Sequence, residues 1–301
     1  MKDREVCSGK QVGEATAGIR EFAPPSPRQM HDLLRLARWY FRPEFLGLEE
    51  LDLRRPALFV GNHTLYGLMD AALMIEHLYT QHGVLLRGLG DRGHFKVPGW
   101  RALLVKCGMV LGTPENCSTL MNARQSILVF PGGGREVMRR KGEAYQLVWK
   151  QRAGFARLAI AHGYDIIPFG SVGPDETFKI LLDANDIMHS RLWKWLRARN
   201  DLTRGGDMLP PIIKGIGPTL LPRPQRFYFG FGRRISTARL QGQEYDPAVV
   251  WEVRNKTARA VRRQIARLIR HRAEDRQRSW SAIRKWLAPL DRSVGLTSAD
   301  G

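Results

Sequence analysis

The sequence predicts an α/β protein with a mainly parallel central sheet flanked by helices. Short apolar runs alternate with segments of helical periodicity, as in parallel sheets whose strands are joined by helices. The runs are apolar throughout, which is typical of strands that are buried on both faces. With 301 residues and a hydrophobic fraction of 43%, the chain is long enough to bury one large core.

The expected elements follow one another along the chain. Five apolar runs bounded by Gly, Pro or Asp are the expected strands, at 56–61, 84–89, 127–130, 165–169 and 227–231. Helical periodicity marks the segments between them, at 69–79, 98–107, 114–124 and 145–162. Before the first strand, apolar residues recur at helical spacing from Gln29 to Phe41, so an amphipathic N-terminal helix is expected there, closed by Pro43.

The C-terminal segment 248–290 differs in composition from the rest. It carries twelve Lys or Arg residues against three Asp or Glu residues, interleaved with an apolar stripe that includes tryptophans. This pattern is typical of an interfacial membrane helix, and the alternative is a basic C-terminal helix that packs its stripe on the core. The expected division is therefore an N-terminal tail and amphipathic helix (1–45), a catalytic domain (46–240) and a basic helix with its tail (241–301).

Charge and cysteine content limit the class of function. The formal net charge of +19 favours anionic partners, such as a membrane surface, a phosphate-rich co-substrate or nucleic acid. The tail's apolar stripe and the lack of a recognisable nucleic-acid motif favour the membrane over nucleic acid. Three cysteines without metal-ligand spacing predict reduced thiols, no bound metal and a cytosolic compartment. The absence of a signal-peptide pattern or a long apolar window predicts a peripheral protein that is not secreted.

A histidine and a carboxylate follow the first expected strand. His63 lies on the turn directly after it, beside Asn62, and Asp70 begins the next expected helix. A carboxylate that holds one ring nitrogen leaves the other free to accept a proton from a hydroxyl, so the pair suits a general base. The alternative interpretation is a structural histidine on a turn, with Asp70 capping the helix.

A glycine-rich turn follows the strand at 127–130. Gly132, Gly133 and Gly134 precede Arg135 and Glu136, and such a turn can bring several backbone N–H groups close to an anion. It lacks the spacing of a P-loop or a dinucleotide-binding turn, and a plain glycine turn with a surface arginine is the alternative. Ser171 lies in a third strand-end loop, but Phe169 stands where a nucleophile elbow requires glycine, so Ser171 is a poor nucleophile candidate.

These loops, in this order, resemble the acyltransferase blocks of the lysophospholipid acyltransferase superfamily. The matching segments are Asn62, His63 and Asp70 for the first block, 94–108 for the second, 130–135 for the third and 166–168 for the fourth. Two departures stand out: Leu68 occupies the family's usual aspartate position, and Gly132 or Gly133 replaces a glutamate that helps phosphate-acceptor members bind glycerol phosphate. Segments 61–70, 130–136 and 141–145 resemble the diacylglycerol-acyltransferase-like branch, which includes phytyl ester synthases, and the resemblance covers roughly residues 40–240.

The resemblance implies an O-acyltransferase at the cytoplasmic face of an anionic membrane. His63 and Asp70 would be catalytic, and Asn62, Gly132, Gly133, Gly134, Arg135 and Glu136 would contact substrate. It implies acyl-CoA or acyl carrier protein as co-substrate, without a further cofactor, and a neutral lipid alcohol as acceptor. The alternatives are a lysophosphatidic acid acyltransferase and, in another class, a basic nucleic-acid-binding protein.

Overall fold

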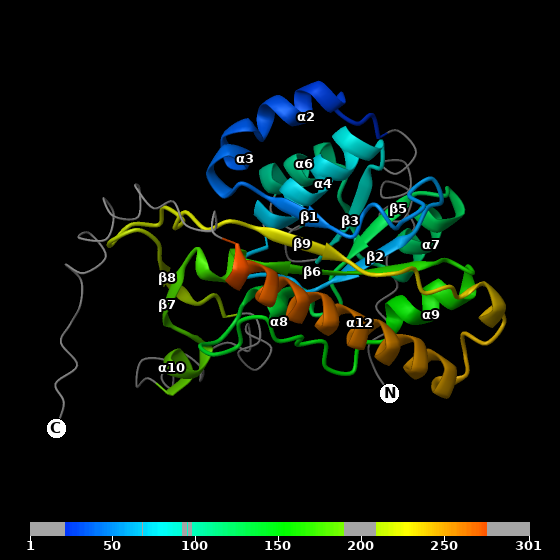
Figure 1. Cartoon of the computed structure of the whole chain (residues 1–301). Coiled ribbons are helices and arrows are strands. Elements are labelled where there is room, and N and C mark those ends of the chain that lie inside the picture. Colours follow the sequence, from blue (N-terminus) through cyan, green and yellow to red (C-terminus); the bar gives the residue numbers. More distant parts are fainter. Residues whose placement is uncertain (1–21, 68, 92–94, 96–97, 190–208, 276–301) are drawn as a thin grey trace.

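The computed structural model describes residues 22–67, 69–91, 95, 98–189 and 209–275, and within them a central sheet organises the chain (Figure 1). Seven described strands form it, in the order β1-β9-β6-β2-β5-β3-β4. Their bounds are Glu44–Leu46 (β1), Leu58–Gly61 (β2), Leu86–Gly90 (β3), Val110–Leu111 (β4), Ser126–Val129 (β5), Ile166–Val172 (β6) and Tyr228–Phe231 (β9). All neighbouring pairs are parallel except β6 and β9, so the expected fold class is confirmed.

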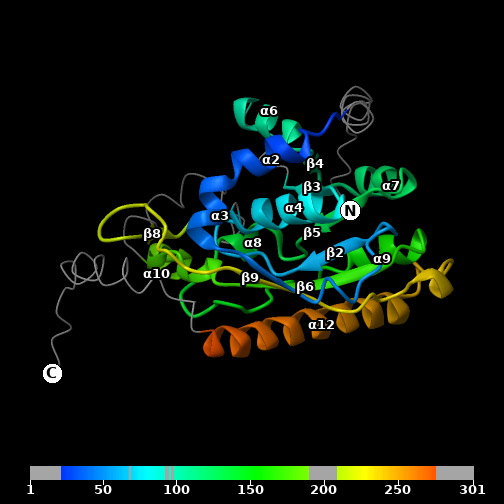
Figure 2. The ribbon, with the colours of Figure 1, turned by 45° about the horizontal axis from the view of Figure 1, so that its top comes forward.

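Helices cover both faces of this sheet (Figure 2). Helix α4 (Met69–His82) contributes Leu73, Met74 and Leu78 to a core cluster on one face, together with Phe41. Helices α7 (Pro114–Asn122), α9 (Gly154–Ala161) and α12 (Pro247–Glu274) contribute to the cluster on the other face. The strands between them are buried throughout, since β2, β6 and β9 contain only buried residues, as their unbroken apolar runs predicted.

The N-terminal helix is present but is divided in two. Helix α2 (Pro27–Leu33) begins at a capping box formed by Ser26 and Gln29, and α3 (Arg35–Phe41) follows after a break at Leu34. The pair is joined to α4 by a charge cluster, because Arg38 lies 3.1 Å from Glu76 and His31 3.2 Å from the same carboxylate.

Helix α12 corrects the expectation of a membrane-facing stripe at 248–290. Its apolar side lies on the sheet, and the buried residues are Val250, Val253, Thr257, Ala258, Ala260, Val261, Ile265 and Leu268. Its solvent side carries Lys256, Arg259, Arg262, Arg263, Arg267 and Arg270, all exposed. The basic C-terminal helix is therefore confirmed, whereas the lipid-facing stripe is wrong for 248–274, and residues 276–290 lie outside the described residues.

One expected helix is shorter than its pattern predicted. The apolar periodicity at 145–162 predicted a single helix, but α9 begins at Gly154 and residues 145–153 form an irregular segment. Tyr145 has a positive φ of 63° and donates its backbone N–H to Asp175, so this segment is shaped by long-range contacts.

Smaller elements lie around the sheet. They are α6 (Pro98–Lys106), α8 (Gly133–Val137), α10 (Ala184–His189), the 3₁₀ turns Pro174–Glu176 and Ala238–Leu240, and the strands β7 (Lys179–Leu182) and β8 (Ile212–Lys214), which pair antiparallel. Among the residues described, none of the helices combines the length and the apolar character that crossing a bilayer requires.

Candidate active site

The predicted site lies where β2, β5 and β6 reach their carboxyl ends. Gly61 pairs with Phe169 and Val60 with Val129, so the segments that follow β2 and β5 leave the sheet side by side. His63 follows β2, and Phe130 and the glycine turn 132–134 follow β5. The structure therefore brings together the two loops that the sequence singled out, at the edge where ligands collect in open parallel sheets.

The His63 ring is held by two neighbours. It stacks on Phe130 with ring centroids 3.9 Å apart and an interplanar angle of 9°. Gly67, at a φ of 53°, passes so close to the ring edge that a Cβ at this position would lie 1.9 Å from His63 Cε1. His63 remains partly exposed, so an imidazole in a fixed orientation is within reach of a substrate.

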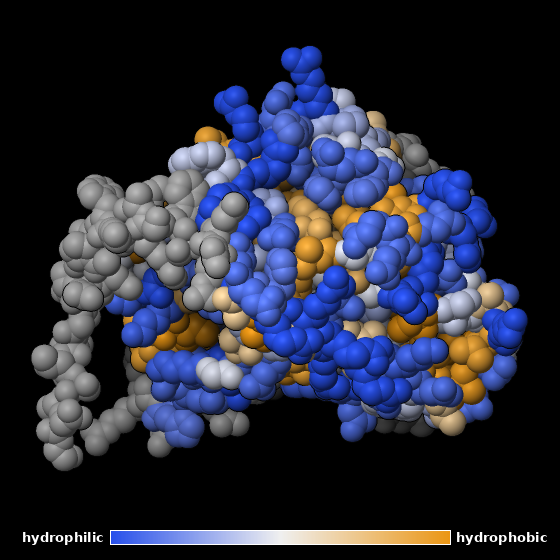
Figure 3. Space-filling model, viewed as in Figure 1, coloured by the Kyte–Doolittle hydropathy of each residue, from blue (hydrophilic) through white to orange (hydrophobic). Residues whose placement is uncertain are grey.

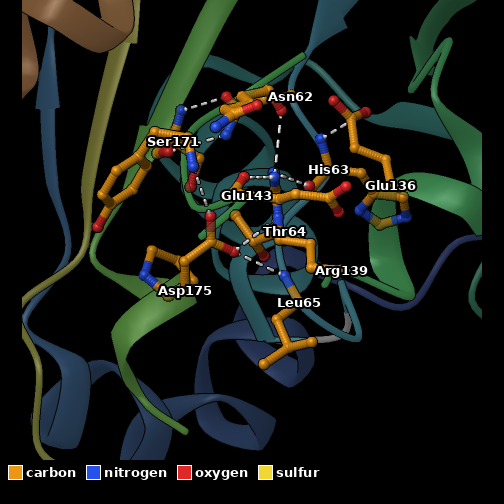
Figure 4. Close-up of polar contacts among 12 residues, drawn as sticks. Asn62, His63, Thr64, Leu65, Glu136, Arg139, Glu143, Ser171 and Asp175 are labelled. Carbon is orange, nitrogen blue, oxygen red and sulfur yellow. Dashed lines mark hydrogen bonds and ion pairs between the residues drawn. The ribbon is translucent and has the colours of Figure 1, made fainter. Parts of the chain in front are cut away.

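Asn62 faces the protein interior, and its expected contact with substrate stays a prediction. Its side chain is fully buried and bonds the main chain of β6 twice: Asn62 Nδ2 donates to Ser171 O at 3.0 Å, and Ser171 N donates to Asn62 Oδ1 at 2.8 Å (Figure 4). Asn62 therefore fastens the end of β2 to β6, immediately before His63.

Asp70 is buried at the start of α4. Its carboxylate accepts a hydrogen bond of 2.7 Å from Thr64 Oγ1, the hydroxyl next to His63 in the chain. Burial raises the pKa of Asp70 to about 6, although the Thr64 hydrogen bond favours the charged form. Asp70 thus acts on the His63 loop through Thr64, and a direct pair between Asp70 and His63 remains a prediction.

Glu136 is also buried, and its carboxylate binds backbone, while its expected contact with substrate stays a prediction. Oε2 accepts the N–H of His63 at 3.1 Å, and Oε1 accepts the N–H of Val148 at 3.2 Å. Burial raises the pKa of Glu136 to about 7. Only glycine fits at position 132, because a Cβ there would lie 2.2 Å from Glu136 Oε2.

Arg135 is occupied by a carboxylate that the site prediction did not include. Its two terminal nitrogens lie 2.9 Å and 2.5 Å from the oxygens of Glu143, and only 6% of the arginine is exposed. This bidentate pair explains why Lys-Gly-Glu at 141–143 accompanies the glycine turn in the sequence. The expectation that Arg135 reaches a substrate stays a prediction.

The glycine turn itself is the part of this loop that opens to the surface. Gly132 is buried, whereas Gly133 and Gly134 are partly exposed. Arg152 holds the turn by donating hydrogen bonds to the carbonyls of Pro131, at 3.1 Å, and Gly132. Backbone at Gly133 and Gly134 can therefore approach a ligand beside His63.

Two buried residues of the site escaped sequence reasoning, Arg139 and Asp175. Their side chains lie 3.1 Å apart, and each is 2% exposed. Arg139 donates to the carbonyl of His63 at 2.6 Å, and Asp175 accepts the N–H of Leu65 at 2.8 Å. Arg139 is followed by Arg140 and Lys141, and Lys and Arg are rarely buried, so its sequence context gives no signal of burial.

This arrangement can carry out proton transfer. A partly exposed imidazole stands beside a glycine turn, over buried carboxylates that order the surrounding backbone. A hydroxyl docked against the ring can lose its proton to a nitrogen of His63, and nearby backbone N–H groups can stabilise an oxyanion that forms next to it.

A family model described as "Acyltransferase" matches residues 42–172. This stretch runs through the end of β6 and includes His63, Asp70 and the glycine turn. Residues 42–172 therefore form an acyltransferase-family domain, and the resemblance drawn from the sequence is confirmed.

Several curated relatives sharpen this assignment. Phytyl ester synthase 2 of Arabidopsis thaliana is 34% identical over 206 residues, which are 64% of this chain and 29% of the relative. Phytyl ester synthase 1 of the same plant is 30% identical over 250 residues, 77% of this chain and 35% of the relative. The human "DGAT1/2-independent enzyme synthesizing storage lipids" is 29% identical over 153 residues, 51% of this chain and 45% of the relative. The chain thus spans about a third of the length of the phytyl ester synthases that it matches.

One solved structure is also similar. The 1-acyl-sn-glycerophosphate acyltransferase of Thermotoga maritima shares 12% sequence identity at a TM-score of 0.47, with 78% of each chain covered.

Proposed function

We propose that this protein is an O-acyltransferase that moves a fatty acyl group from a thioester donor to a neutral lipid alcohol at a membrane surface. The observation that carries the proposal is the orientation of His63, stacked on Phe130 beside the glycine turn and partly open to solvent. Family membership supports the reaction class. The donor is acyl-CoA or acyl carrier protein, whose thioester needs no further cofactor to activate it.

The proposed reaction has two proton transfers and one change of acyl partner. His63 accepts the hydroxyl proton as the alcohol oxygen attacks the thioester carbonyl, giving a tetrahedral intermediate with a negatively charged oxygen. The carbon–sulfur bond then breaks, the ester forms, and His63 returns the proton to the leaving thiolate. The N–H of Gly133 already donates to the carbonyl of Phe130 at 2.9 Å, so the backbone N–H of Gly134 is the donor of the turn that is suited to stabilise the oxyanion. One such donor is commonly worth about 2.7–4 kcal/mol of barrier.

A neutral acceptor is supported by the residues that line the glycine turn. Gly132 or Gly133 stands where phosphate-acceptor relatives have a glutamate, and the two terminal nitrogens of Arg135 are paired with Glu143. Neither the glycine turn nor Arg135 therefore offers a side-chain group for a glycerol phosphate. The names of the relatives agree with this proposal, since they refer to phytyl esters and storage lipids. Diacylglycerol, monoacylglycerol and long-chain alcohols are the proposed acceptors.

The proposed membrane contact is an apolar rim on the side of the sheet where the site lies. We define the rim as Leu33, Leu36, Trp39, Leu220 and Leu221, which are 60–76% exposed. Tyr40 joins its two parts, because its hydroxyl donates to the carbonyl of Pro222 at 2.5 Å. Exposed Leu181, Leu182 and Ile212 extend apolar surface over β7 and β8 (Figure 3).

The rim is connected to the site and has a cationic border. The Tyr66 hydroxyl donates to the carbonyl of Pro211 at 2.6 Å, which ties the His63 loop to the start of β8. Arg28 and Arg35 are exposed on the same helices as Leu33 and Leu36. Apolar side chains beside arginines suit the interface of an anionic bilayer, and we propose the cytoplasmic face for this contact.

The acceptor is identified by competition for one labelled acyl-CoA. The purified protein is given diacylglycerol, a long-chain alcohol and lysophosphatidic acid together in liposomes, and the labelled products are separated by thin-layer chromatography. We expect label in neutral esters. Label found solely in phosphatidic acid would overturn the neutral acceptor in favour of phospholipid synthesis, and no labelled product with either CoA or carrier-protein donors would overturn the reaction itself.

A further inference from the structure

The peptide groups on either side of His63 are held by two oppositely charged side chains from one short segment. Glu136 Oε2 accepts the N–H of His63 at 3.1 Å, and Arg139 Nη2 donates to its carbonyl oxygen at 2.6 Å (Figure 4). Both side chains are buried, with Glu136 0% and Arg139 2% exposed. Hydrogen bonds to charged groups in such surroundings are short and strong, so they fix the backbone at His63.

These two charges are anchored on their far sides as well. Arg139 is paired with Asp175 and donates to the carbonyls of Glu143, at 2.6 Å, and Gln146, at 3.1 Å. Glu136 accepts the N–H of Val148 with its second oxygen, at 3.2 Å. The segment 143–148 therefore fixes the two side chains that bind the backbone of His63.

We propose that Glu136 and Arg139 are positioning residues, which set the direction of the His63 ring by clamping its backbone. His63 lies two residues after Gly61, the last residue of β2, so strand pairing ends before it and does not orient it. The clamp fixes the backbone from which the ring projects, and Phe130 and Gly67 then fix the ring. This inference rests on the proposed function, in which His63 is the base.

A partly buried arginine, Arg234, provides a matched control. Arg234 lies 3.3 Å from Asp165 and donates to the carbonyls of Asp52, at 2.6 Å, and Arg55. It thus makes the same kinds of contact as Arg139, but at the amino ends of the strands, away from His63. A purely structural role predicts similar kinetic behaviour for variants of both arginines, whereas a positioning role predicts that only Arg139 affects turnover.

The decisive experiment compares Arg139→Lys with Arg234→Lys. Lysine keeps the charge but loses the planar fork that contacts several acceptors at once. The kcat and KM of each variant are measured with labelled acyl-CoA. The kcat is calculated per mole of folded protein, which is the fraction that unfolds cooperatively. We expect kcat of Arg139→Lys to fall about 10- to 100-fold with little change in KM, because a misplacement of about 1 Å can cost 10²-fold in rate. Arg234→Lys should keep the wild-type kcat.

Glu136→Gln tests the other side of the clamp, and decides the matter if Arg139→Lys does not fold. Glutamine offers one acceptor oxygen and turns an N–H₂ towards the second backbone donor, so we again expect a loss in kcat without a change in KM. Suppose that the wild type is active and His63→Ala is inactive, but that the clamp variants turn over like Arg234→Lys. This result would overturn the clamp and leave the proposed function standing. A wild type without acyl transfer would overturn the proposed function.

Discussion

The two ends of the sheet use buried charge in different ways. At the carboxyl ends of the parallel strands, burial raises the pKa of Asp70 to about 6 and of Glu136 to about 7. At the amino ends, Asp165 is paired with two arginines, Arg55 at 2.9 Å and Arg234 at 3.3 Å. The carboxyl ends therefore hold two carboxylates whose charged form burial disfavours, Asp70 and Glu136, beside the arginine-paired Asp175, whereas Asp165 at the amino ends faces two arginines. This contrast points to function at the first end.

Open volume alone does not identify the functional end of the sheet, because a hollow also lies at the other end. A hollow of about 760 Å³ lies at the amino ends, bordered by residues such as Asp52, Arg54, His82 and Arg124. Non-glycine residues with a positive φ occur at both ends, since Tyr66 and Tyr145, at 58° and 63°, adjoin the loops around His63, and Arg124, at 52°, borders the hollow. The oriented imidazole of His63, stacked on Phe130, therefore marks the carboxyl ends more clearly than open volume or backbone strain does.

The largest effect that separates the two ends is expected from glycine substitution. Gly67→Ala places a methyl group 1.9 Å from His63 Cε1, whereas Gly83→Ala, at a similar positive φ of 69°, meets nothing within 4 Å. Both variants should lose about 1–2 kcal/mol of stability from the backbone alone. Only Gly67→Ala should also lose about 10²-fold in kcat, because the ring must leave its position.

Thermal unfolding measures the loss of stability, and the turnover of the folded fraction measures the loss of kcat. Equal turnover in Gly67→Ala and Gly83→Ala would mean that the position of the His63 ring does not govern the reaction, and the contrast between the two ends would fail.

A smaller effect is expected at the surface. Replacing Leu33, Leu36 and Trp39 together by serine should reduce sedimentation with anionic liposomes several-fold at raised salt, because apolar insertion survives screening. Tyr245→Ser is the control, since this exposed tyrosine precedes α12 at the amino-end side. Unchanged sedimentation of the triple variant would remove the rim as the membrane contact. Wild-type protein that leaves liposomes but stays on DNA at the same salt would support the nucleic-acid alternative.

Local patterns were sufficient to predict much of the fold and the position of the base. The apolar runs at β2, β5 and β6 predicted three strands of the sheet. His63 and the glycine turn lie just after the ends of two of these strands, β2 and β5. Whether a residue lies in a buried strand or at its end depends on the residues next to it in the chain, so it can be predicted from the local sequence pattern.

Partners far apart in sequence could not be predicted in the same way. Arg139 pairs with Asp175, and Arg135 pairs with Glu143, because the fold places these carboxylates next to them. Likewise, the stripe of α12 fits a sheet as well as a lipid surface, and only the packing of Val261 and Ile265 onto the core decides between the two.

The central claim, that His63 is the base of an acyl transfer, is tested most directly by comparing His63→Ala with His162→Ala. His162 bonds Ser118 at 3.0 Å and adjoins the amino ends of the strands, so it serves as a histidine of matched chemistry outside the site. With labelled acyl-CoA and a neutral acceptor, His63→Ala should lose about 10²–10⁴-fold in turnover while His162→Ala stays at the wild-type rate. A folded His63→Ala protein with near-normal turnover would contradict the account.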